Sequence, residues 1–207
     1  MEEYLAVAEG GQDEIIEKKS RFIGYTASVQ TEDEAAAFIE GIRKKHYDAR
    51  HCCYAYSIGL DNQPLLRFSD DGEPQGTAGK PILEVVQGSG VRNICIAVVR
   101  YFGGTLLGTG GLVRAYTDAA KAGLEASVIR QRRRLIEAEL SAEYPDLGKL
   151  QYLIGNTDAE ITDTVYTERV LVKVQVYAPV YDRFVKAVTE VTAGRVSVEK
   201  RGEVFSL

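Results

Sequence analysis

Cysteine is scarce in this chain of 207 residues, which has only Cys52, Cys53 and Cys95. Three is an odd number, and the spacing of these residues is not that of metal ligands. No disulfide framework and no cysteine-ligated metal site are therefore expected. The N-terminus also lacks a basic segment followed by an apolar one, and no apolar run approaches the length that spans a bilayer. We accordingly expect a reduced, cytoplasmic protein without a membrane partner.

An excess of positive charge is missing as well. The chain has 25 Lys and Arg against 30 Asp and Glu, a formal net charge of −5. Non-specific binding to phosphate backbones rests on surplus Lys and Arg, so attraction of the whole molecule to nucleic acid is not expected, although local basic patches stay open. Internal repeats and low-complexity segments are also absent, which argues against a solenoid or a disordered tail.

The N-terminal part carries alternating strand and helix patterns. Thr31 and Glu34 resemble a capping box at the start of a helix that should end near His46, and the β-branched run Ile94–Tyr101 predicts a buried central strand. The remaining expected elements are two strands within Asp13–Val29, a hairpin of His51–Ile58 and Pro64–Phe68, a short helix at Ala78–Val86 and a long helix at Gly110–Val128.

After Val128 the pattern changes to that of a small separate domain, with the boundary expected near 129–134. Its predicted order is βαββαβ, which is typical of a ferredoxin-like domain. The predicted elements are Leu135–Ala142, Leu147–Ile154, Ala159–Tyr166, Val170–Tyr177, Tyr181–Val191 and Gly194–Glu203.

Two glycine-dense loops stand out from the rest of the chain. Such clusters let backbone N–H groups approach a ligand, and a helix that begins just afterwards favours an anion at its N-terminus. The alternative is that the glycines serve only positive φ angles and tight packing. Neither a Walker loop nor a dinucleotide fingerprint is present. The glycines are Gly72, Gly76 and Gly79 in the first loop and Gly103, Gly104, Gly108, Gly110 and Gly111 in the second.

Charged residues accompany both loops. Arg100 and Arg114 flank the second loop and suit a phosphate or carboxylate, with Lys80 and His51 as further candidates for anion binding. The two arginines would equally be satisfied by ion pairs with the acidic residues of the first loop, and for that reason we expect the two loops to face each other across one cleft. The acidic residues, which could alternatively hold a divalent cation or form a solvated turn, are Asp70, Asp71 and Glu73.

His51 and the adjacent cysteines also allow a thiol nucleophile with a histidine base. Neighbouring residues in a strand point to opposite faces, so only His51 and Cys53 would share one. Because cysteine is commonly buried, a structural role is the competing interpretation.

One dense basic run lies near the expected boundary. In a strand, Arg130, Arg132 and Arg134 would share one face and could contact RNA phosphates. Tyrosines that could stack on bases are Tyr144, Tyr152, Tyr166 and Tyr177. The alternative is a solvated strand whose charges are met by Glu137, Glu139 and Glu143.

The segments FSDDGEPQGTAGKPIL and VVRYFGGTLLGTGGLVRAY, together with HCCYAYSIG and YPDLGKLQYLI, resemble the bacterial YigZ family, whose N-terminal domain is shared with eukaryotic IMPACT. Cys52 departs from the family pattern, which has asparagine there. The resemblance implies an α+β protein of two domains. Residues 1–130 would form the left-handed βαβ superfold found in a ribosomal protein and an elongation factor, and residues 131–207 a ferredoxin-like domain.

In the eukaryotic relatives, the shared domain modulates a translation-regulating kinase by binding the activator of that kinase. The resemblance therefore favours a non-enzymatic regulator or adaptor linked to translation, which binds a protein of the translation apparatus or structured RNA. The alternative is an enzyme or sensor for a small anionic, phosphate-containing ligand in the cleft between the glycine loops, with Asp70, Asp71 or Glu73 as base. No cofactor is expected, no catalytic residue is assigned, and the oligomeric state stays open.

Overall fold

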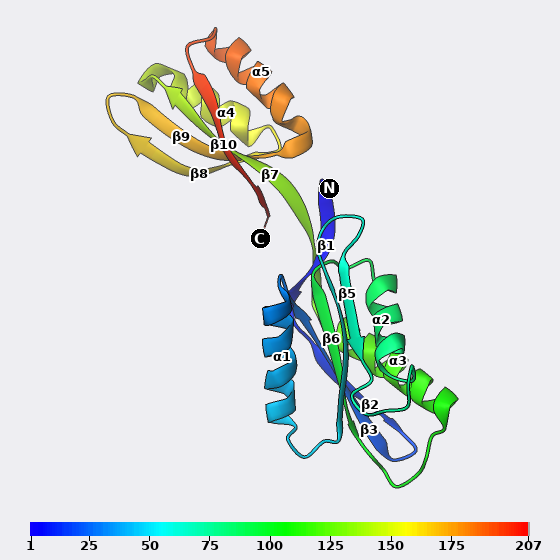
Figure 1. Ribbon diagram of the computed structural model, residues 1–207. Coiled ribbons are helices and arrows are strands. Elements are labelled where there is room, and N and C mark those ends of the chain that lie inside the picture. The colour runs from blue at the N-terminus through cyan, green and yellow to red at the C-terminus, as the bar shows by residue number, and fades with distance from the viewer. Residues whose placement is uncertain (207) are drawn as a thin grey trace. The chain divides into compact units, whose positions relative to one another are not determined.

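A computed structural model describes residues 1–206 as two compact units, each with its own sheet and core (Figure 1). The first unit comprises residues 4–131. The second comprises residues 132–207 together with Met1–Glu3, of which the structure describes all but residue 207. The fold is therefore mixed α+β with two domains, as the sequence predicts. Among the described residues, no helix is both long and apolar enough to cross a membrane.

The first unit is an antiparallel five-stranded sheet in the order β2-β3-β6-β4-β5. Its elements are β2 (Gln12–Glu17), β3 (Ser20–Ser28), α1 (Glu32–Lys45), β4 (His51–Ile58), β5 (Leu65–Ser69), α2 (Gly79–Gly88), β6 (Ile94–Tyr101) and α3 (Thr109–Glu125), preceded by β1 (Glu3–Glu9), which starts in the second unit. The hairpin and α1 agree with the sequence analysis to within one residue at each end, whereas the long helix ends at Glu125 rather than Val128.

The central strand β6 separates two apolar layers. One layer packs the sheet against α2 and α3, and the other packs it against α1 (Figure 1). All residues of β6 except Tyr101 are buried, which agrees with the predicted central strand. Helix α3 packs closely on the sheet at Gly24 of β3. A Cβ added to Gly24 would lie 2.0 Å from the carbonyl oxygen of Ala119 on α3.

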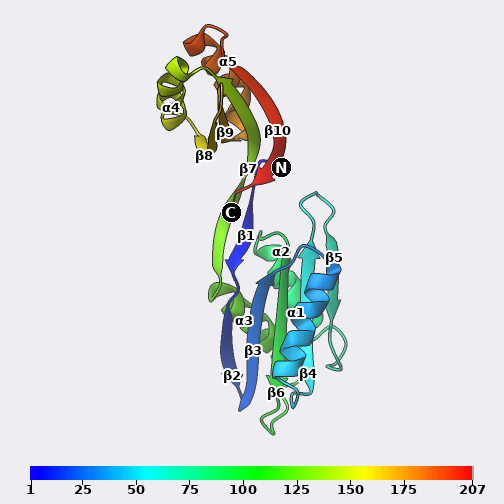
Figure 2. The ribbon, with the colours of Figure 1, turned by 90° about the vertical axis from the view of Figure 1, so that its left-hand side faces the viewer.

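The second unit has the predicted βαββαβ order. Its strands pair antiparallel as β10-β7-β9-β8, with α4 and α5 packed on one face (Figure 2). The elements are β7 (Val128–Ala142), the 3₁₀ turn η1 (Tyr144–Asp146), α4 (Leu147–Gly155), β8 (Ala159–Tyr166), β9 (Val170–Tyr177), the 3₁₀ turn η2 (Ala178–Val180), α5 (Tyr181–Thr192) and β10 (Ser197–Phe205).

The segment expected to separate the domains is itself part of a strand. β7 is continuous over 15 residues and starts seven residues before the predicted Leu135. The division into units falls within it, between Gln131 and Arg132. Met1–Glu3 group with the second unit because Glu2 and Glu3 form ion pairs with arginines of β7.

Candidate functional site

The glycine loops lie at the end of the first unit's sheet where β6 finishes. Arg100 is paired in register with His51 of β4 and with Phe22 of β3, so the three side chains form a row across adjacent strands. Cys53 and Val98, the pair two residues further along the same strands, belong to the core under α2 and α3, and the row faces the same layer. His51 and Cys53 therefore share a face, as the alternation predicts.

Arg100 forms a buried ion pair with the first loop. Its Nη1 lies 2.7 Å from Oε1 of Glu73, and the two side chains are only 8% and 4% exposed. The hydroxyl of Tyr116 on α3 donates to the same oxygen over 2.8 Å. Burial raises the pKa of Tyr116, so the phenol stays a donor. The expected pairing between the loops is thus present for Arg100 and Glu73.

The other two acidic side chains hold the backbone of the first loop. Oδ1 of Asp70 accepts from the N–H groups of Ala78 and Gly79, and Oδ2 accepts from Gly76. Asp70 therefore satisfies donors at the start of α2, where Ala78 is the capping residue.

Asp71 is engaged on both carboxylate oxygens. Oδ1 accepts from Arg43 of α1 over 2.8 Å, and Oδ2 accepts from the backbone N–H of Cys52 over 2.7 Å. Among residues 1–206 no group of three histidine, cysteine or acidic side chains could hold a metal ion. The acidic loop is a structural turn in this arrangement. No sequence pattern singled out Arg43 as a partner of this loop.

Backbone geometry accounts for much of the second glycine loop. A Cβ on Gly103 would lie 2.0 Å from the carbonyl carbon of Lys19, and Gly104 and Gly108 have φ angles of 84° and 73°. These three positions therefore require glycine whether or not a ligand binds. Gly110, by contrast, has open space around it, and both it and Gly111 lie in the first turn of α3.

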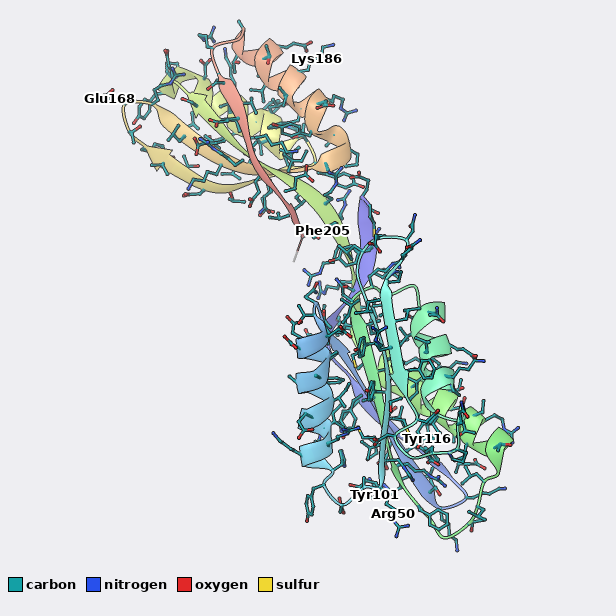
Figure 3. All side chains as sticks on the ribbon, in the orientation of Figure 1. Arg50, Tyr101, Tyr116, Glu168, Lys186 and Phe205 are labelled. Atoms are coloured by element: carbon teal, nitrogen blue, oxygen red, sulfur yellow. The ribbon has the colours of Figure 1, made fainter. Side chains whose placement is uncertain are left out.

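A pocket of about 220 Å³ opens beside this loop. It is lined by Arg50, His51, Arg100, Phe102 and Leu106. Figure 3 shows Arg50 and Tyr101 at this end of the unit, one residue beyond the paired His51 and Arg100. The Arg100 guanidinium lies over two aromatic rings, 5.4 Å from the centroid of Phe22 and 5.5 Å from that of Phe102. Its Nε is buried and has no hydrogen-bond partner.

His51 is oriented by the first loop. Its Nδ1 lies 2.8 Å from the carbonyl oxygen of Asp71. A carbonyl can only accept, so Nδ1 carries the proton and Nε2 is the nitrogen left for other contacts. Gly72 lies against the ring, where an added Cβ would be 3.4 Å from Nδ1.

Arg114 and Lys80 lie outside this pocket. Both side chains are exposed, on α3 and α2 respectively, and within the described residues no ion pair joins Arg114 to the acidic loop. Of the four cationic or titratable candidates for anion binding, the structure therefore brings together only Arg100 and His51. It adds Arg50, Phe102 and Leu106, which no sequence pattern singled out.

The arginine run of β7 is largely engaged within the second unit. Arg134 forms ion pairs with Glu2 at 2.6 Å and with Glu203 at 2.8 Å, and Arg132 donates to the backbone oxygen of Ser206. These hydrogen bonds raise the pKa of Arg134. The partners of Arg134 are not the expected Glu137, Glu139 and Glu143, because strand pairing brings both ends of the chain beside β7. Arg130 lies in the first unit and is exposed.

Of the four tyrosines that could stack on bases, one has charged partners within the second unit and three are exposed. Tyr177 donates to Glu3 over 2.7 Å, and the Arg133 guanidinium lies 3.9 Å from its ring centroid. Tyr144 and Tyr166 stack on each other and remain exposed, as does Tyr152.

Residues 18–124 match the Impact N-terminal domain family, and this range contains both glycine loops and the pocket. The chain belongs to the IMPACT family. Residues 140–195 match a family described as a domain of unknown function, DUF1949. The resemblance predicted from the loop sequences is thereby confirmed.

The bacterial similarity extends over both units of this IMPACT family member. IMPACT family member YigZ of Escherichia coli is 41% identical over 87% of this chain and 89% of its own length. A solved structure described as that of a hypothetical protein is 39% identical and covers 98% of each chain, with a TM-score of 0.64. The IMPACT homologue of Dictyostelium discoideum is 36% identical over 45% of this chain and 28% of its own.

Proposed function

We propose that this IMPACT family member is a non-enzymatic regulator linked to translation, and that it acts by binding a protein of the translation apparatus through its first unit. The link to translation rests on the family resemblance. The first unit is chosen because it contains the segment that matches the Impact N-terminal domain, residues 18–124. The similarity to the Dictyostelium protein is of comparable length, 97 residues.

The observation that carries the proposal is a contrast between the two glycine loops. In the first, Asp70 and Asp71 use both carboxylate oxygens on the fold, and Glu73 is bound to Arg100 and Tyr116. The carboxylates that the enzymatic alternative requires as a base are thus engaged. In the second, Phe102 and Leu106 are 52% and 83% exposed on a backbone held by required glycines. Exposed apolar side chains on a fixed loop are typical of a protein contact surface.

A protein partner is favoured over RNA by the charges. The chain carries a net charge of −5, and Arg134 and Arg132 of the basic run already have partners within the second unit. Phosphate contacts would have to displace those internal bonds.

The test uses the tagged full-length chain and purified ribosomal subunits and translation factors, each offered singly and with or without ribonuclease. We expect one protein component to be retained in a ribonuclease-resistant manner. Phe102→Asp should abolish retention, because it places a charge in the apolar contact. Tyr152→Asp changes an exposed aromatic residue on α4, 76% exposed against 52% for Phe102; it is the control and should leave retention unchanged.

Retention that disappears with ribonuclease would replace the protein partner by RNA. Failure to retain any component, or equal loss in both variants, would overturn the proposal.

A further inference from the structure

The buried guanidinium of Arg100 has a donor that the fold does not use. Arg100 is 7% exposed, and Nη1 is satisfied by Glu73, but Nε has no partner and exposes less than 1 Å². Leaving a charged donor buried without an acceptor costs free energy, and such groups are rare in native structures. The rings of Phe22 and Phe102 lie near the guanidinium, and neither carries a nitrogen or oxygen acceptor. An unused donor of this kind calls for an acceptor from outside the chain.

The pocket beside Arg100 has the charge to receive such an acceptor. Arg50 on its wall is exposed, and no ion pair within residues 1–206 involves it. Glu73 offsets the charge of Arg100, Asp71 is bound to Arg43, and Asp48, two residues before Arg50, accepts from the Tyr101 hydroxyl. None of the residues that line the pocket is acidic, whereas two are arginines. The pocket therefore keeps an excess positive charge, although the protein as a whole is negative.

We propose that this pocket binds the phosphate or carboxylate group of a small molecule, with Arg100 Nε and Arg50 as donors to its oxygens. A volume of about 220 Å³ lies below the roughly 300–1,000 Å³ of pockets that enclose a whole drug-sized ligand. It suits an anionic group and a few further atoms. Phe102 and Leu106 at the rim would contact the apolar part of the ligand.

Access and orientation follow from the same residues. Because Nε exposes less than 1 Å², an oxyanion reaches it when an outer side chain turns aside, and the exposed Phe102 and Leu106 do so with little loss of packing. His51 keeps Nδ1 on the Asp71 carbonyl, so Nε2 is the ring nitrogen left for contacts within the pocket. This inference goes beyond the proposed function and does not depend on it.

Isothermal titration of the full-length chain with inorganic phosphate tests the proposal, at an ionic strength held constant with NaCl. Glycerol phosphate and acetate titrations distinguish a phosphate from a carboxylate ligand. We expect saturable binding of at least one of the three. Arg100→Lys keeps a charge beside Glu73 but removes Nε, and should weaken binding at least about tenfold.

A second pair of variants keeps the test decisive if Arg100→Lys does not fold. Leu106 is largely exposed, so both Leu106→Glu and Leu106→Gln should fold. The glutamate places a negative charge at the rim and should weaken binding about fivefold or more relative to the glutamine. Arg114→Ala removes an exposed charge of the same unit outside the pocket and should leave binding unchanged.

Two results would overturn the proposal. One is the absence of saturable binding up to about 10 mM of all three anions. The other is binding that Arg114→Ala abolishes and Leu106→Glu leaves intact, which would place the anion at the start of α3 instead.

Discussion

The two units hold their arginines in opposite ways. In the second unit, three consecutive arginines of β7 are conspicuous in the sequence, and all have partners: Arg132 the Ser206 carbonyl, Arg133 Glu3, and Arg134 Glu2 and Glu203. In the first unit, a single arginine at the end of an apolar strand is buried, ion-paired and still has an unused donor.

Density of charge in a sequence therefore does not identify a binding surface. A basic run on an exposed strand attracts carboxylates from neighbouring segments at small cost. A buried arginine has few neighbouring acceptors. The positions of two or three side chains therefore determine which of its N–H donors remain available to a ligand.

The largest expected effect comes from breaking the buried pair. Glu73→Leu leaves the Arg100 charge unpaired in the core and should destabilise the first unit by about 3–5 kcal/mol. Amide hydrogen exchange of β6 measures this loss separately from the second unit. The double variant Arg100→Met with Glu73→Leu should recover a large part of it, because no charge then stays buried. A double variant no more stable than Glu73→Leu would contradict the assignment of the cost to a stranded charge.

A smaller effect is expected from the corresponding change in the second unit. Arg134→Met removes two exposed ion pairs, so protection of the amides of β9 should fall far less than protection of β6 falls in Glu73→Leu. Added salt should reduce the difference between Arg134→Met and the wild type, since exposed pairs are screened. A loss as large as that of Glu73→Leu would remove the contrast between the two units.

The smallest effect concerns the opposite face of the first unit's sheet, where a polar cluster is fully partnered. Tyr25 lies 2.6 Å from His46 Nε2, Nδ1 lies 2.9 Å from the Tyr101 hydroxyl, and that hydroxyl donates to Asp48. Burial, with Lys45 adding to it, lowers the pKa of His46. The unfolded chain therefore takes up the proton first as the pH falls below about 6.5, and the stability of the first unit declines there.

His46→Gln should flatten this decline. We expect the loss of melting temperature between about pH 7.5 and pH 5.5 to be smaller in the variant than in the wild type. An unchanged slope would show that His46 titrates alike in the folded and unfolded states.

Local patterns in the sequence predicted most of the elements. Glu34 donates its N–H to Oγ1 of Thr31, as expected for a capping box, and its carboxylate accepts from Gln30. The apolar run of β6 and the βαββαβ order are likewise confirmed. These features depend on residues near one another in the chain, so their spacing carries the information.

Elements that depend on distant partners were predicted less well. The sequence analysis predicts no strand at β1 and starts β7 at Leu135, because the charged first half of β7 has no apolar alternation. Both strands are paired with segments far away in sequence. The partners Tyr116 of Glu73 and Arg43 of Asp71 were missed for the same reason.

The sequence by itself thus determined the family, the two domains, the glycine loops and the presence of a pairing between them. The packing of strands and loops, however, sets which charges meet, buries Arg100 with one donor unused, and places Arg50, Phe102 and Leu106 around the pocket beside it. The physical reason is that helix and turn preferences act over a few residues. The choice of an ionic partner, by contrast, depends on which strands lie side by side and on how much water their packing excludes.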